Sequence, residues 1–146
     1  MAEKNKEILK DALKLLSICE VSESKLKQFL ERHGYEESRI KETIKYLRKR
    51  NLINDTRLAN FIVENCVRKK KGINYVRNAL TNKGISEHII SETLARIYPD
   101  SLEYKIARRL FYLSKKPLKK TLYWLASRGF SEGTIEKLRG EIGEQQ

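Results

Sequence analysis

The sequence holds few residues that interrupt helices and no long apolar run. Its 146 residues include two prolines and seven glycines, which leave no room for a long disordered linker. No apolar stretch approaches the roughly 18 residues that a membrane-spanning helix needs. The N-terminal residues 1–14 are charged and lack the apolar segment of a secretory signal. We therefore expect a cytoplasmic protein with no membrane partner.

Cysteines are equally scarce, and Cys19 and Cys66 each lie in an apolar stretch with helical spacing. In a reducing compartment such residues behave as small hydrophobic side chains, so we expect both to be buried and free. A disulfide between them is the less favoured alternative, because disulfides are uncommon in the cytosol.

The motifs of common enzymes and metal sites are also missing. The sequence contains neither a GxxxxGK[ST] loop nor a GxGxxG loop, so we predict no nucleotide cofactor. His33 and His88 lie far from each other and from both cysteines, which disfavours a metal site. No serine or cysteine stands where a nucleophile would be marked. We therefore predict a protein that is not an enzyme, with no cofactor, no metal and no catalytic residue.

What is present is a pattern that recurs three times. In each copy an apolar helical stripe ends at a glycine, and an isoleucine of the next stripe follows at a constant distance. The glycines are Gly34, Gly84 and Gly129, at intervals of 50 and 45 residues, and the isoleucines are Ile40, Ile90 and Ile135. Self-similarity at this period is typical of helical repeats, and strand-like alternation is nearly absent. We predict an all-α protein, a tandem array of three three-helix repeats at residues 1–54, 55–99 and 100–146.

Local signals predict where helices begin and which sides are buried. Helix starts are predicted at Ser22 or Ser24, at Asp55, at Ser86, and at Asp100, which has capping-box spacing to Glu103. Apolar spacing predicts a buried stripe before each glycine, which includes Leu80 before Gly84. Other positions predicted to be buried are Leu58, Phe61 and Ile62, and further along Leu102, Ile106, Leu110 and Leu113. Trp124 shares the place of Phe29 and Ala79 in the repeats, so it too is predicted to be buried.

Acidic residues are absent from two long parts of a basic chain. The chain has 31 Lys and Arg against 19 Asp and Glu, a net charge of +12. No acid occurs in residues 65–86, the first basic segment, or in residues 104–131, the second basic segment. Such segments favour an anionic partner, with nucleic acid or a nucleoprotein first in line. The alternative is a solvated lysine-rich surface that only aids solubility.

We predict that the contact surface lies on these two segments. Its residues are Arg68, Lys69, Lys70, Lys71, Arg77, Lys105, Arg108, Arg109, Lys115, Lys116, Lys119 and Lys120. Arg77 has a strong alternative, because a helical arginine can instead form a salt bridge within its own repeat. Tyr75, Tyr112 and Tyr123 are candidates for stacking on bases or on protein.

One part of the sequence resembles the RecX family of recombinase regulators. In that family an Asp-Asp pair precedes an aromatic-Ala helix start, and a basic run with Gly, an Ile-Arg pair, a Leu and Lys-Gly-Ile follow. The matching residues here are Asn54, Asp55, Leu58, Ala59, Lys71, Gly72, Val76, Arg77, Leu80, Lys83, Gly84 and Ile85. The first repeat fits the family pattern at Ser22, Glu23, Leu26, Leu30, Gly34 and Tyr35. Asn54, Leu58 and Val76 are mild departures from the pattern.

The resemblance implies a fold and a function. RecX proteins are curved, elongated arrays of three-helix units that bind the RecA–DNA filament along its groove. They inhibit its ATPase, strand-exchange and co-protease activities and so limit recombinational repair and the SOS response. For this chain we accordingly expect a regulator whose partners are the RecA filament, single-stranded DNA and also double-stranded DNA. We expect a monomer, because the predicted helices leave no long exposed apolar stripe.

Two other functions are compatible with the composition. One is a general basic helical-repeat protein that binds nucleic acid without a recombinase. Its binding would weaken steeply with salt. The logarithm of the binding constant would fall with the logarithm of the salt concentration, with a slope near −0.7 for each phosphate neutralised on a single strand. The other is a protein scaffold whose charge serves solubility alone and which does not bind DNA at physiological salt.

Overall fold

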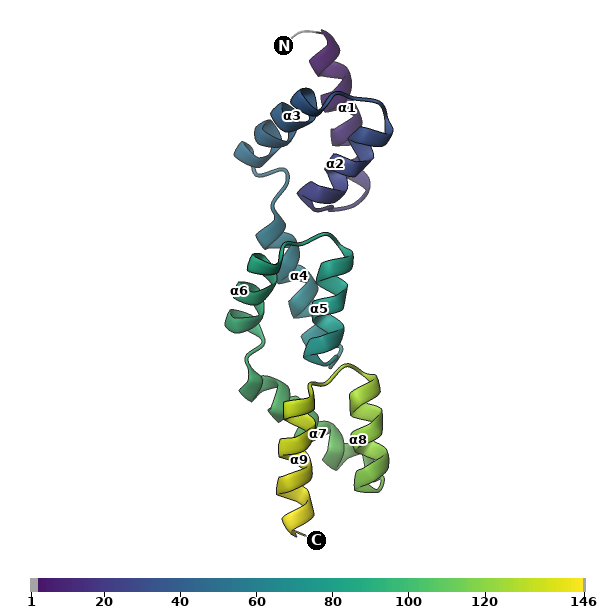
Figure 1. Ribbon diagram of the computed structural model, residues 1–146, viewed down its shortest axis with the longest axis vertical. Coiled ribbons are helices and arrows are strands. Elements are labelled where there is room, and N and C mark those ends of the chain that lie inside the picture. The colour runs from purple at the N-terminus through teal and green to yellow at the C-terminus, as the bar shows by residue number, and fades with distance from the viewer. Residues whose placement is uncertain (1–2, 146) are drawn as a thin grey trace.

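The computed structural model describes residues 3–145, and within that range helices are the only regular secondary structure. The helices are α1 (Glu3–Ile18), α2 (Glu23–Arg32), α3 (Glu37–Lys49), α4 (Asp55–Arg68), α5 (Ile73–Asn82), α6 (Glu87–Ile97), α7 (Asp100–Ser114), α8 (Leu118–Ser127) and α9 (Glu132–Gln145). Figure 1 shows an elongated stack of three layers with the two termini at opposite ends. We refer to α1–α3 as unit 1, α4–α6 as unit 2 and α7–α9 as unit 3. The predicted all-α array of three-helix repeats is confirmed.

The second helix of each unit ends in the same way. Gly34, Gly84 and Gly129 follow α2, α5 and α8 with φ angles of 82°, 82° and 93°. Glycine is the residue that adopts this left-handed backbone at least cost. In each case the N–H of the next residue donates to a carbonyl five positions back, as Ile85 does to Leu80 at 3.1 Å. The recurring glycine is therefore the signal that turns the chain from the second helix to the third.

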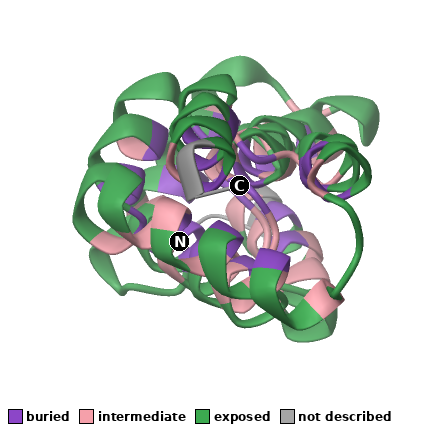
Figure 2. Cartoon of the chain, turned by 90° about the horizontal axis from the view of Figure 1, so that it is seen from below, coloured by how far each residue is buried: buried purple, intermediate pink, exposed green. Residues whose placement is uncertain are grey.

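Each unit buries its own cluster of apolar side chains. Leu26, Leu30 and Leu47 are among those of unit 1, Val76 and Leu80 among those of unit 2, and Leu125 and Leu138 among those of unit 3. Figure 2, which looks along the stack, shows buried segments between the helices and exposed segments around the outside. Since no single core runs through the molecule, the packing between units decides how rigid the stack is.

The predicted buried side was wrong for part of α4 and α7. Leu113 is 64% exposed and Phe61 is 61% exposed, whereas α7 buries Glu103, Ala107 and Phe111. The helix is rotated relative to its most apolar stripe because the carboxylate of Glu103 lies inside the molecule, where it accepts four hydrogen bonds. Ala107 and Phe111 follow at helical spacing, so they face inward with it.

Two predicted helix caps were also wrong. Ser22 and Ser86 do cap α2 and α6, but Asn54 caps α4, accepting the Arg57 N–H at 2.9 Å. Pro99 occupies the cap position of α7, and no side chain caps that helix. Asp55, predicted as a cap, and Glu103, predicted as the capping-box partner of Asp100, have a different task, because both reach into the preceding unit.

The two cysteines differ in environment. Both are free, but only Cys66 is buried, and Cys19 is exposed just beyond the end of α1. The prediction that both are buried was therefore wrong for Cys19. Burial raises the pKa of the Cys66 thiol, although Lys69 and Lys71 partly oppose the shift.

We expect the thiols to react with a maleimide or disulfide reagent at very different rates. Cys19 should be modified at once in the native protein, whereas Cys66 should react only when its unit opens, because its thiolate is both inaccessible and disfavoured. Mass spectrometry over a labelling time course measures this. In Cys19→Ser, fast labelling of the remaining thiol would contradict the burial of Cys66.

A matched pair of leucines tests the packing. Leu80 is fully buried in unit 2 and Leu113 is 64% exposed in unit 3. We expect Leu80→Ala to lower the free energy of unfolding by about 2–5 kcal/mol, since it leaves a cavity. Leu113→Ala should change it by less than about 0.5 kcal/mol. Urea unfolding followed by circular dichroism gives both values, and similar losses in the two variants would mean that the buried sides are misassigned.

Candidate interaction surface

The units are joined by the same contact twice. Between units 1 and 2, Ser22 Oγ donates to the Lys83 carbonyl at 2.6 Å and Ser24 Oγ to the Gly84 carbonyl at 2.8 Å. Between units 2 and 3, the N–H of Gly72 donates to the Arg128 carbonyl at 3.1 Å. In each joint, the turn before a unit's second helix meets the glycine turn of the following unit.

An acid from the following unit completes each joint. Asp55 Oδ1 accepts the N–H of Glu23, the first residue of α2, at 2.9 Å. Glu103 Oε2 accepts the N–H of Ile73, the first residue of α5, at 2.8 Å. A carboxylate is favourable there because it meets the positive end of a helix. Burial raises the pKa of Asp55, although the bond to the Glu23 N–H partly opposes the shift.

Glu103 is the most heavily bonded side chain of the second joint. Besides the Ile73 N–H, its carboxylate accepts the Ser131 N–H at 3.1 Å, Ser131 Oγ–H at 2.5 Å and Thr134 Oγ1–H at 2.6 Å. The residue has no exposed surface. A buried charge is tolerated when every lone pair is used in this way. This carboxylate therefore fixes α5, α7 and α9 relative to one another.

Arg128 brings the two basic segments together at this joint. Its guanidinium donates to the carbonyls of Lys69 at 2.9 Å and Lys70 at 3.4 Å. The same group lies 4.9 Å above the centre of the Trp124 ring. Residues far apart in the sequence thus form one continuous basic and aromatic surface. Neither Arg128 nor Trp124 was among the predicted contact residues, although both lie in the second basic segment.

Trp124 was predicted to be buried, and this was wrong. The side chain is 40% exposed and borders a groove between α7 and α8, together with Leu110, Leu113 and Lys116. Its counterparts Phe29 and Ala79 are both partly buried. The larger indole is held at the surface by the overlying Arg128, a contact typical of guanidinium groups on aromatic faces.

The structure separates the predicted contact residues into paired and unpaired cations. Arg77 is bonded to Glu87 at 2.5 Å, the salt bridge foreseen as its alternative, and Arg108 is bonded to Glu141 at 2.8 Å. Lys71 lies 4.8 Å above the Tyr75 ring. Within residues 3–145, no ion pair is formed by Arg68, Lys69, Lys70, Lys105, Arg109, Lys115, Lys116, Lys119 or Lys120.

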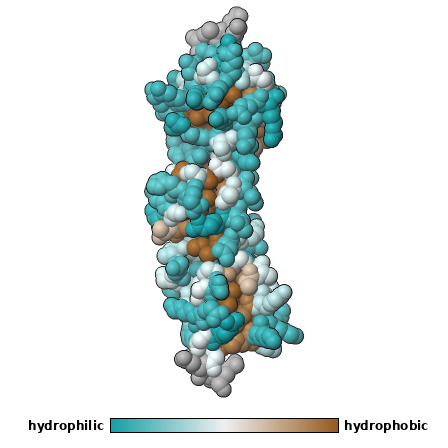
Figure 3. Space-filling view, in the orientation of Figure 1, coloured by the Kyte–Doolittle hydropathy of each residue, from teal (hydrophilic) through white to brown (hydrophobic). Residues whose placement is uncertain are grey.

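The unpaired cations do not converge on one point. Arg68, Lys69 and Lys70 lie at the end of α4, beside the joint between units 2 and 3. Lys105 and Arg109 are exposed on α7, and the four remaining lysines surround the turn from α7 into α8. Figure 3 shows narrow hydrophobic bands between hydrophilic side chains on one face of the stack. An extended partner that follows units 2 and 3 suits this arrangement better than a compact ligand.

The three candidate tyrosines are exposed to different degrees. Tyr75 is 45%, Tyr112 47% and Tyr123 82% exposed. Arg108 lies 5.1 Å above the Tyr112 ring. Buried Tyr98 has a supporting role: its hydroxyl donates to the Lys71 carbonyl at 2.8 Å and so fixes the backbone of the first basic segment. Burial raises the pKa of Tyr98, so this hydroxyl stays a donor at neutral pH.

Two kinds of site are absent from residues 3–145. None of the helices there combines the length and apolar character that crossing a membrane requires. Nor do three or more His, Cys, Asp or Glu side chains in this part of the chain come together as a set that could hold a metal ion.

Comparison with known proteins gives one consistent family. Residues 54–94 match the family model described as RecX, second three-helix domain. The regulatory protein RecX of Streptococcus gordonii is 35% identical over 127 residues, which are 82% of this chain and 49% of the relative. That of Clostridioides difficile is 32% identical over 141 residues, 90% of this chain and 66% of the relative. The chain thus spans about half the length of the first relative and 66% of the length of the second.

Solved structures agree on the fold. A crystal structure of RecX from Lactobacillus salivarius superposes with a TM-score of 0.83 at 24% identity, covering 98% of this chain and 99% of that one. A second crystal structure, of a regulatory protein RecX, gives a TM-score of 0.73 at 23% identity and covers 95% of this chain. At these identities the likeness establishes the architecture alone.

Proposed function

The chain belongs to the RecX family, and we propose that it regulates a RecA recombinase by binding the RecA–DNA filament and lowering its ATPase, strand-exchange and co-protease activities. In this role it would limit recombination and the SOS response. It would act by binding, as a monomer and without chemistry of its own. The relevant partners would be the filament protein and its DNA.

One observation carries the proposal. The two acid-free segments meet at the joint between units 2 and 3, where Arg128 donates to the carbonyls of Lys69 and Lys70. From there, unpaired cations extend along unit 3 to the turn before α8. A nucleoprotein filament presents DNA phosphates and acidic side chains along its length. A row of cations would therefore contact several filament subunits at once.

The joints support a mechanism of restraint. Glu103 and the paired turns fix unit 3 against unit 2, so the row of cations has a fixed shape. Each contact can be weak, because contacts linked in one rigid body gain from a high effective concentration. Binding across successive subunits would oppose the rearrangements that accompany ATP hydrolysis.

The decisive experiment is a titration of RecA ATPase activity on single-stranded DNA. We expect strong inhibition when this protein is present at a small fraction of the recombinase concentration. At that ratio too little protein is present to sequester the DNA, so inhibition must arise from action on the filament.

The same titration distinguishes filament regulation from its main alternative, general binding of nucleic acid. Inhibition that sets in only near saturation of the DNA, and that added DNA reverses, would reject filament regulation. The function would then be general binding of nucleic acid by a basic helical repeat protein. A salt series would support that reading by its slope per neutralised phosphate.

A further inference from the structure

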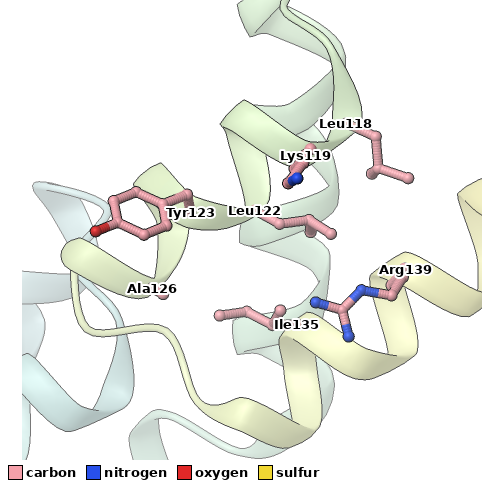
Figure 4. Close-up of a pocket in the computed structure, with 7 residues that line it drawn as sticks. All are labelled: Leu118, Lys119, Leu122, Tyr123, Ala126, Ile135 and Arg139. Carbon is pink, nitrogen blue, oxygen red and sulfur yellow. The ribbon is translucent and has the colours of Figure 1, made fainter.

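Unit 3 carries a groove between α8 and α9 whose floor is apolar. The floor is formed by Leu118, Leu122 and Ile135, and the rim by Lys119, Tyr123 and Arg139. Figure 4 shows Leu122 of α8 and Ile135 of α9 facing each other, with Tyr123 directed away from Arg139. Tyr123 is 82% exposed and makes no hydrogen bond or ring contact with any described residue. The groove therefore has an apolar floor with cationic and aromatic edges.

Units 1 and 2 have a groove at the same place, and there the structure shows which part of the next unit borders it. Counted from the shared glycines, Leu118 has the position of Glu23 in unit 1 and of Ile73 in unit 2. The groove beside Glu23 is bordered by Asp55 of unit 2, and the groove beside Ile73 by Asp100 of unit 3. In both cases the beginning of the next unit's first helix forms one border of the groove.

The bordering helices share a chemistry. Each places a carboxylate on the first N–H of the second helix of the preceding unit, Asp55 on Glu23 and Glu103 on Ile73. Leu102 and Ile106, on the same helix as Glu103, also pack against the apolar cluster of unit 2. The contact of α7 with unit 2 thus combines an acid in the first turn with apolar side chains behind it.

In unit 3 the groove has become better suited to a separate partner. Within residues 3–145, only residues of α8 and α9 border this groove. Where unit 2 has Arg77, bonded to Glu87, unit 3 has the apolar Leu122. Lys119 and its neighbour Lys120 are unpaired, and Arg139 is bonded to Glu136 on its own helix. Apolar floor and cationic rim complement an acidic amphipathic helix.

We propose that the α8–α9 groove binds a helix of the partner protein that begins with an acidic residue and presents an apolar side chain behind it. The partner helix takes the place that α4 and α7 take on units 1 and 2. The carboxylate lies near Lys119 at the beginning of α8, and the apolar side chain lies on Leu118 and Leu122. This inference rests on the proposed function, since the partner protein is the recombinase of the filament.

A photo-crosslinker in place of Tyr123 tests the groove directly. The variant Tyr123→p-benzoylphenylalanine is bound to RecA filaments on single-stranded DNA, collected by sedimentation and irradiated. We expect a crosslink to the recombinase that maps to a helix beginning with Asp or Glu. Phe61→p-benzoylphenylalanine is the matched control, because Phe61 is another exposed aromatic, on α4, and it lies outside the groove.

Several other results of the crosslinking experiment would overturn the proposal or the proposed function. A crosslink from position 123 to DNA, to a second copy of this chain or to a recombinase segment without an acidic helix start overturns the proposal. So does co-sedimentation without any crosslink at position 123. Failure of both variants and of the unmodified protein to sediment with the filament would reject the proposed function itself, and the groove's partner with it.

A double variant gives an independent readout. Lys119→Glu/Tyr123→Ala should raise the concentration needed for half-maximal ATPase inhibition on the order of tenfold, the usual scale for loss of an interface anchor. Lys14→Glu/Phe61→Ala removes one exposed lysine and one exposed aromatic far from the groove, and it should inhibit like the unmodified protein. Equal inhibition by the two variants would contradict the groove's role.

Discussion

Replacing Glu103 by alanine is expected to lower the free energy of unfolding by about 4 kcal/mol. The carboxylate is fully buried and accepts hydrogen bonds from Ile73, Ser131 and Thr134. Removing one member of a buried charged network costs about 3–5 kcal/mol, because its partners are left unpaired away from water. The loss should fall on the joint, because this carboxylate bonds to residues of both units that it links.

Two probes followed during urea unfolding distinguish a loosened joint from general destabilisation. Trp124 is the single tryptophan of the chain and lies in unit 3, so its fluorescence reports on that unit. Circular dichroism reports on all helices. In Glu103→Ala we expect the fluorescence transition to occur at lower urea than the main loss of helix, as in repeat arrays whose cooperativity breaks down.

The control is Glu64→Ala, which removes an exposed acid of α4 that forms no ion pair within residues 3–145. It should change the free energy of unfolding by less than about 0.5 kcal/mol. If Glu103→Ala unfolds at the same urea concentration as Glu64→Ala, the buried carboxylate does not hold the joint.

Reversing the charge of the first basic run should weaken filament binding about 100-fold. Lys69→Glu/Lys70→Glu/Lys71→Glu places three carboxylates where we propose that the filament's anionic surface docks. Like charges facing each other across an interface cost several kcal/mol, and about 2.8 kcal/mol corresponds to a hundredfold. Helical content should be unchanged, because Lys69 and Lys70 are exposed and unpaired and Lys71 has only the contact with Tyr75.

The matched control makes the same change of net charge elsewhere. Lys10, Lys14 and Lys49 are exposed in unit 1 and form no ion pair among the residues described. Their reversal to glutamate should leave the half-inhibitory concentration within a fewfold of that of the unmodified protein. Equal losses in the two triple variants would mean that net charge governs binding, and full inhibition by the first variant would remove Lys69–Lys71 from the surface.

The array itself could be predicted from the sequence because its signal is local and repeated. A positive φ is required at the end of each second helix, and glycine satisfies it three times. Ser22 and Ser86 cap helices for an equally local reason, since each hydroxyl bonds to an N–H three residues on. Such features depend on a few neighbouring residues, and the sequence displays them directly.

The errors at Glu103, Leu113 and Trp124 involve contacts between distant parts of the chain. Glu103 looked like the end of a capping box, but its hydrogen-bond partners are 28 to 31 residues away. Its burial rotates α7 and exposes Leu113. Trp124 is held at the surface by Arg128, whose orientation depends on carbonyls of unit 2. Apolar periodicity identifies a helix, but it cannot tell which side a neighbouring unit will cover.

The predicted contact residues show the same division. The exposure of the lysines could be predicted from the basic character and spacing of their segments. The salt bridge predicted as the alternative role of Arg77 is the one it forms with Glu87. The pairing of Arg108 with Glu141 required knowledge that α7 lies against α9. That the two basic segments are neighbours could not be read from their spacing, because it depends on the joint.

The repeated joint has a further consequence. In both joints the turn before the second helix of one unit meets the glycine turn of the next, and the reverse contact does not occur within residues 3–145. The units are therefore stacked head to tail, and the two ends of the stack are chemically different. A RecA–DNA filament also has a direction, because its subunits are arranged head to tail. In the proposed complex with such a filament, the molecule would fit in one of the two senses, so all bound copies would point the same way.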